Sequence, residues 1–179
     1  MKPTFFDIET QYLLNEVREN KSKLKIAVAG ITCGDRTLLF EEPEVDQLIA
    51  NLLNAELIVG HNILAFDYEV LRPYTTGEVI EKLKKKTVDM FDHLKNITGQ
   101  WISLDDLGKR NVGHQKTLKS IDVPKMWRDG KKQEIREYLI NDLKMTEAVY
   151  NHGKQTGSLK YEHKDYGKSL GEHNIKVSW

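Results

Sequence analysis

The chain has 179 residues, of which 39% are hydrophobic and 30% are charged, and its 27 basic and 27 acidic residues give a formal net charge of zero. This composition excludes a disordered chain, and the balanced charge argues against binding nucleic acid through bulk positive charge, although local basic patches remain compatible with it. We expect residues 1–179 to form a single domain, with a C-terminal tail at 157–179 whose role is open.

The cysteine content and the terminal sequence bear on the compartment. Cys33 is the single cysteine and cannot form an internal disulfide, which favours a reducing compartment. The first residues lack the basic flank and apolar run of a signal peptide, and no apolar stretch approaches the ~18 residues that a membrane span needs. We therefore expect a cytoplasmic protein without membrane association.

The first part of the chain predicts three strands with short connections. Their apolar runs lie at 4–10, 24–31 and 36–41, and the short connections favour an antiparallel meander. Pro43 then stands near the first position of a helix, which is a favourable place for proline. The apolar residues that follow it, from Val45 to Leu52, recur at helical spacing.

Beyond residue 55, short strands alternate with helices. Strands are expected at 56–60 and 87–90, and the segment at 114–131 is predicted to be a basic loop. Helices are expected at 64–71, 91–98, 104–111 and 133–152, and the chain ends in a strand-like segment at 175–179. This order predicts an α/β fold in which a mixed β-sheet, an antiparallel meander plus parallel strands, is flanked by helices on both faces.

Two acids stand at the end of the first predicted strand, in Thr4–Thr10. Asp7 and Glu9 are two residues apart, so their side chains project from the same face of the strand. Two carboxylates held so close repel each other unless a positive charge lies between them, and a divalent cation is the usual solution. A solvated strand end is the alternative interpretation.

Two further acids, Asp67 and Asp142, also have both a structural and a functional interpretation. Asp67 follows Gly60–Phe66 where a strand turns into a helix, and an acid near a helix N-terminus is favourable without any ligand. Asp142 lies near the apolar face of the long helix, where an acid is costly unless it is paired or bound to a metal. Tyr138 precedes it by four residues and so lies beside it. The alternatives are a half-buried core tyrosine and an exposed helix acid.

Taken in order, these residues resemble the three motifs of the DEDD, or DnaQ-like, 3′→5′ exonucleases of the ribonuclease H-like superfamily. The motifs stand here as FFDIET, GHNILAFDYEVL and EYLINDLKMTEAVY, and the resemblance covers residues 1–152. The second motif is similar to that of the exonuclease domains of family-B DNA polymerases. Tyr138, four residues before the last acid, matches the tyrosine (DEDDy) branch, whereas the histidine branch would need a histidine where Glu137 stands.

The resemblance implies a two-metal site for phosphodiester hydrolysis. Asp7 would bridge two divalent cations, Mg²⁺ or Mn²⁺, while Glu9 and Asp142 would hold the ion that activates water. Asp67 would hold the other ion, directly or through water. Tyr138 would orient the attacking water, because a phenol with a reference pKa of about 10 is a poor base at neutral pH.

The resemblance also implies a substrate, the 3′ end of single-stranded DNA or RNA. The terminal nucleotide would lie between the first strand and the turn before Asp67, and the residues expected to bind it are Ile8, Thr10, His61, Asn62 and Phe66. The expected function is a stand-alone 3′→5′ exonuclease that releases nucleoside 5′-monophosphates, with DNA favoured over RNA. Two alternatives stay open: an inactive nucleic-acid-binding or protein-docking module of the same fold, and a metal-dependent endonuclease.

The lysines at 82 and 84–86 and the basic stretch 116–132 could follow the phosphate backbone, with a solvated surface as the alternative.

Overall fold

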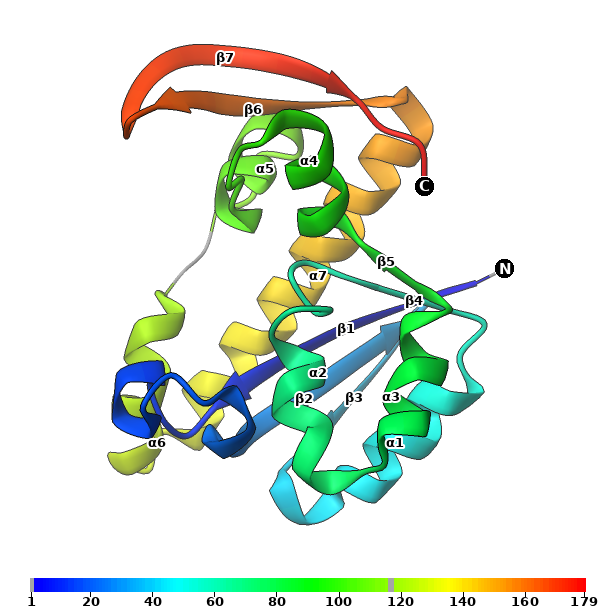
Figure 1. Cartoon of the computed structure of the whole chain (residues 1–179), viewed down its shortest axis with the longest axis vertical. Coiled ribbons are helices and arrows are strands. Elements are labelled where there is room, and N and C mark those ends of the chain that lie inside the picture. The colour runs from blue at the N-terminus through cyan, green and yellow to red at the C-terminus, as the bar shows by residue number, and fades with distance from the viewer. Residues whose placement is uncertain (1, 116–117) are drawn as a thin grey trace.

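A central sheet of five strands, in the order β3-β2-β1-β4-β5, organises the protein in a computed structural model that describes residues 2–115 and 118–179 (Figure 1). β1 and β2, and β2 and β3, pair antiparallel, whereas β1 and β4, and β4 and β5, pair parallel. The strands are β1 (Pro3–Thr10), β2 (Ile26–Cys33), β3 (Arg36–Phe40), β4 (Leu57–Gly60) and β5 (Thr87–Asp89). The predicted mixed sheet of a meander and parallel strands is confirmed.

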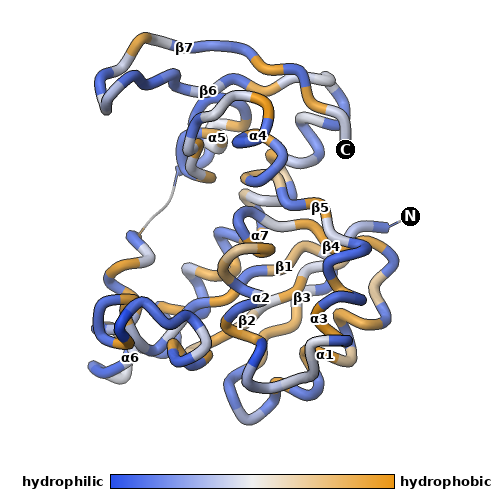
Figure 2. Tube along the Cα trace, in the orientation of Figure 1, coloured by the Kyte–Doolittle hydropathy of each residue, from blue (hydrophilic) through white to orange (hydrophobic). Residues whose placement is uncertain are grey.

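Helices cover both faces of the sheet, as expected, and divide the core into two clusters. One cluster joins Phe5 of β1 to α4–α7, and the other joins Phe6 and Ile8 to α1–α3. Figure 2 shows the hydrophobic residues along the central strands. The helices are α1 (Val45–Asn54), α2 (Asp67–Leu71), α3 (Gly77–Lys84), α4 (Met90–Thr98), α5 (Leu104–Asn111), α6 (Val123–Arg128) and α7 (Lys132–Thr156).

Four helices differ from the prediction: the sequence predicts no helix at α3, and α2, α6 and α7 differ from their expected bounds for local reasons. α2 begins three residues later than expected: residues 63–66 form a turn, and Phe66, directly before the helix, has a non-helical backbone (φ −121°, ψ −70°). α6 lies inside the segment predicted to be a loop, with Pro124 in its first turn and Val123 and Met126 buried. α7 continues to Thr156 and ends where Gly157 adopts φ 69°, a common way for a helix to stop.

The tail from residue 157 forms a hairpin of β6 (Ser158–Asp165) and β7 (Lys168–Lys176), a separate two-stranded sheet. Of the strand-like end predicted at 175–179, only Ile175 and Lys176 belong to β7, and Ile175 pairs there with Leu159 of β6. The last residue, Trp179, stacks on Tyr150 of α7 with ring centroids 6.0 Å apart. In Figure 1 the hairpin lies beside α4 and α5.

In the part of the chain that the structure describes, no helix is both long and apolar enough to cross a membrane.

Candidate active site

The first strand presents its two acids on the face that α7 covers. Phe6 and Ile8 point to the opposite face, where they are 0% and 4% exposed, so Asp7 and Glu9 must point toward α7. The register of β1 with β2 shifts between Glu9 and Thr10. Such irregularities bend and twist a strand locally and are common beside active sites.

α7 brings the third acid to β1 because it packs closely on the sheet. Gly30 of β2 pairs with Asp7, and a Cβ at this position would lie 2.7 Å from Leu143 Cδ1 and 3.1 Å from Leu139 Cδ2. Asp142, next to Leu143, is therefore held over β1 and is 1% exposed.

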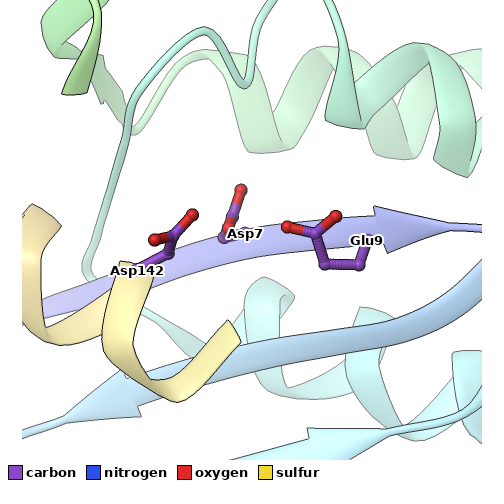
Figure 3. Close-up of side chains that lie close together, drawn as sticks. All are labelled: Asp7, Glu9 and Asp142. Carbon is purple, nitrogen blue, oxygen red and sulfur yellow. The ribbon is translucent and has the colours of Figure 1, made fainter. Parts of the chain in front are cut away.

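The three carboxylates converge. Asp7, Glu9 and Asp142 each offer an oxygen within 4.8 Å of the others, and Figure 3 shows the three side chains on the same side of β1. A set of carboxylate oxygens this close is suited to a hard divalent cation. These three residues, which we call the acidic cluster, could hold a metal ion.

Asp67, the fourth predicted acid, is the first residue of α2 and is 2% exposed. Burial raises its pKa well above the ordinary value of 3.8, the charge of Asp7 raises the pKa further, and a hydrogen bond from the backbone of Ile8 opposes the shift. Among the described residues no donor reaches Asp67 Oδ1, although this atom is buried. A buried oxygen acceptor near Asp7 fits a cation ligand better than a structural cap.

Tyr138 lies one turn before Asp142 on α7, as predicted, and is 1% exposed. It belongs to the core cluster that includes Phe5 and Leu139. It is therefore fully buried rather than half-buried.

The turn before Asp67 is held in place by Asp89, whose role the sequence pattern indicates only in part. Asp89 caps α4, accepting hydrogen bonds from the amides of Phe91 (3.0 Å) and Asp92 (3.3 Å), as an acid just before a helix is expected to do. It also accepts from the amides of Asn62 (2.7 Å) and Leu64 (2.9 Å). Burial raises the pKa of Asp89, and these four amides oppose that shift.

We expect Asp89→Ala to lower the free energy of unfolding by about 3 kcal/mol, because it leaves four partly buried amides without their acceptor. Asp89→Asn, which keeps one acceptor oxygen, should lose less. The matched control is Asp92→Ala on the exposed side of α4, expected to change stability by no more than about 0.5 kcal/mol. Urea unfolding measures all three, and a loss below about 1 kcal/mol for Asp89→Ala would contradict this role.

A cleft of about 1390 Å³ opens over the acidic cluster at the end of β1. All five residues expected to bind substrate line it: Ile8, Thr10, His61, Asn62 and Phe66. Asp7, Glu9, Asp67 and Asp142 line it too, whereas Tyr138 is not among the described residues that do so.

Among the described basic residues of the two predicted patches, Lys119 alone lines the cleft. Lys82 pairs with Glu78 (2.8 Å) and Lys84 with Glu81 (2.9 Å). Lys86 binds the carbonyl oxygen of Ala55 (2.7 Å), at the end of α1.

In the second basic stretch, Arg128 and Lys132 pair with Glu16 (3.2 Å) and Glu41 (2.8 Å). Lys119 does line the cleft, and Lys109, which was not singled out, lines it as well. Lys116 lies outside the described residues.

Fold and site together define a class: an α/β protein with a mixed sheet of the ribonuclease H-like kind and an acidic cluster in an open cleft. Among solved structures it is similar to the family B DNA polymerase from the hyperthermophilic archaeon Pyrobaculum calidifontis, with a TM-score of 0.64 and 13% identity. The match covers 86% of this chain and 24% of the polymerase chain. At this identity the likeness shows a shared fold. Comparison of the sequence with protein-family models gave no match, and neither did comparison with curated proteins.

Proposed function

We propose that this protein is a metal-dependent 3′→5′ exonuclease that acts on single-stranded nucleic acid, DNA in preference to RNA, and releases nucleoside 5′-monophosphates. The observation that carries the proposal is the convergence of Asp7, Glu9 and Asp142 within 4.8 Å, in a cleft that Asp67 also lines. Three elements that are distant in sequence supply these four acids. Carboxylates held this close repel one another unless a positive charge lies among them, and a divalent cation would supply it.

Two independent observations support the proposal. The order and spacing of the acids resemble the motifs of DEDD exonucleases, and the second motif resembles that of family-B polymerase exonuclease domains. The fold comparison, which does not use those motifs, finds a family B DNA polymerase that matches over 24% of its own length. That share is the size of one domain within a larger enzyme.

The four carboxylates would hold two Mg²⁺ or Mn²⁺ ions, and Asp7 would be a ligand shared by the two ions. When bound, such ions make a water nucleophilic near neutral pH and neutralise charge on the leaving oxygen. In the proposed reaction the oxygen of a water forms a bond to phosphorus, the bond to the 3′ oxygen breaks, and the leaving oxygen gains a proton. The products are a nucleoside 5′-monophosphate and a strand shorter by one residue.

The test is incubation of the protein with single-stranded DNA and RNA, each carrying a 5′ label, in the presence of Mg²⁺, Mn²⁺ or EDTA. We expect a ladder of labelled products shortened one residue at a time from the 3′ end, with free mononucleotides and with no products in EDTA. Blocking the 3′ end should prevent the ladder.

The same experiment separates the alternatives. Internal fragments that persist when the 3′ end is blocked would indicate an endonuclease. Binding without cleavage in either metal would indicate an inactive nucleic-acid-binding module. The relative rates on DNA and RNA measure the sugar preference.

We expect Tyr138→Phe to lower kcat about 10- to 100-fold, because the phenol hydroxyl would orient the attacking water. The change removes one oxygen and keeps the buried ring, so the thermal stabilisation that Mn²⁺ confers should be unchanged. The measurements are single-turnover cleavage and melting curves with and without Mn²⁺. Equal losses in kcat and in the Mn²⁺-dependent stabilisation would show that Tyr138 acts structurally.

A further inference from the structure

Two aromatic rings and a lysine form a shelf at the side of the cleft. Phe91 and Trp101 both line the cleft, and their ring centroids are 5.4 Å apart in an edge-on arrangement. Lys95 Nζ lies 4.6 Å from the centroid of the Trp101 ring. Trp101 is nevertheless 77% exposed, so most of its ring faces solvent. We call Phe91, Lys95 and Trp101 the aromatic shelf.

The aromatic shelf is anchored to the turn that borders the acidic cluster. The Nε2–H of His61 donates to the carbonyl oxygen of Ile102 (3.0 Å), and the His61 ring packs edge-on against Phe91 at 5.5 Å. Ile102, next to Trp101, is only 3% exposed. The backbone beneath Trp101 is therefore held in place, so a ligand that stacks on its ring has little ordering cost to overcome.

Exposed apolar side chains that are scattered singly over a surface need no functional explanation. Three of the seven large hydrophobic side chains exposed in the described chain line this one cleft: Tyr12, Trp101 and Ile121. The cleft, about 1390 Å³, also exceeds the roughly 300–1,000 Å³ of a small-molecule pocket. Its size and lining suit a short length of polymer.

The chemistry of the aromatic shelf indicates which class of polymer would bind there: one with flat, unpaired rings and negatively charged groups. Bases stack on aromatic side chains whatever their identity, and neighbouring cations attract the phosphates. Lys95 lies on the aromatic shelf, and Lys109 and Lys119 line the same cleft, although Lys109 also pairs with Asp105 (2.7 Å). Bases inside a duplex are already stacked on each other and cannot use such a surface.

We infer that the aromatic shelf is a binding subsite for an unpaired base, stacked on Trp101, of the strand whose 3′ end lies at the acidic cluster. This inference rests on the proposed function and adds to it how the single strand is held: one unpaired base stacks on Trp101, with little regard to base identity.

The test is equilibrium binding of a labelled oligothymidylate of about twelve nucleotides, in Ca²⁺ to slow cleavage, with the oligonucleotide checked to be intact afterwards. Trp101→Ala should raise the Kd roughly 5- to 100-fold, whereas Trp101→Phe, which keeps a ring, should change it by less than about threefold. The matched control is Ile97→Ala on α4, because Ile97 is 56% exposed but is not among the residues lining the cleft. It should leave the Kd unchanged.

An abasic scan shows whether stacking is the cause. Bases are removed one at a time along the oligonucleotide. At one position, removing the base should raise the Kd of the wild type by about the same factor as Trp101→Ala does. At that position the Trp101→Ala variant should show no further loss, because the two changes remove one interaction. A blunt duplex of equal length should bind the wild type more weakly, and Trp101→Ala should not alter its Kd.

Unchanged oligonucleotide binding by Trp101→Ala, with cleavage by the wild type intact, would overturn the subsite and leave the proposed function standing. Equal losses for the single strand and the duplex would also overturn it, since they would indicate a general change in the cleft. If the wild type neither binds nor cleaves any oligonucleotide, the proposed function itself is wrong.

Discussion

Replacing Asp7 with asparagine is expected to abolish cleavage, lowering the single-turnover rate by on the order of a thousandfold, or about 4 kcal/mol of transition-state stabilisation. Asp7 lies between the other acids: its ligand oxygen is within 4.8 Å of those of Glu9 and Asp142, and its charge acts on Asp67. Removing the charge of Asp7 should therefore affect all of the other acids. Substituting one of the other acids leaves Asp7 and two further carboxylates in the site.

Asp46→Asn is the matched control for this experiment. It makes the same chemical change on α1, at an exposed acid that is not among the residues lining the cleft. We expect wild-type cleavage from it. Circular dichroism and the melting temperature in EDTA should show that Asp7→Asn is folded. Cleavage within tenfold of wild type by a folded Asp7→Asn would remove the acidic cluster from the mechanism.

Asp67→Asn is expected to raise stability while it removes activity. Asp67 is 2% exposed, and both its burial and the charge of Asp7 disfavour its ionised form. Asparagine has nearly the same shape and no charge. In EDTA at neutral pH, the variant should therefore exceed the wild type in the free energy of unfolding. With Mg²⁺ or Mn²⁺ present, its cleavage should be reduced about a hundredfold or more.

The stability difference between Asp67→Asn and the wild type should depend on pH. A carboxyl group whose pKa is raised by folding contributes stability that is fully present below its unfolded pKa, near 3.8, and that is lost as pH rises through the folded value. In EDTA the advantage of Asp67→Asn should therefore shrink toward zero as pH falls to 3.8 and grow above it. Urea unfolding at several pH values measures this difference.

Adding Mn²⁺ should favour the wild type over Asp67→Asn, the opposite of the stability difference expected in EDTA. Mn²⁺ would bind the ionised form of Asp67, so its stabilisation of the wild type should increase with pH and should exceed its stabilisation of Asp67→Asn. A variant less stable than the wild type in EDTA at neutral pH would show instead that the Asp67 carboxylate is satisfied within the protein and that its role is structural.

The sequence by itself determined the strands of the central sheet, most of the helices and the order of the acids. The five strands of the central sheet, the long helix through Asp142 and the placement of Asp67 at a helix start all follow from local apolar periodicity and local turn residues. Alternation along β1 was enough to place Asp7 and Glu9 on one face, because side-chain direction in a strand depends only on position along it.

Elements with a weak local signal could not be predicted in this way. The hairpin of β6 and β7 is largely polar and exposed, so its residues show little apolar periodicity. α6 has six residues, too few for a helical period to stand out from a basic segment.

Only the tertiary structure decided which side chains meet. The approach of α7 to β2 at Gly30 brings Asp142 within 4.8 Å of the β1 acids, and no local pattern encodes that distance. The double role of Asp89 depends on a turn 25 residues earlier in the chain. The aromatic shelf likewise joins Trp101 to Phe91. The physical reason is the same each time: strand and helix periodicity depend on neighbours in the chain, whereas a site depends on packing between distant segments.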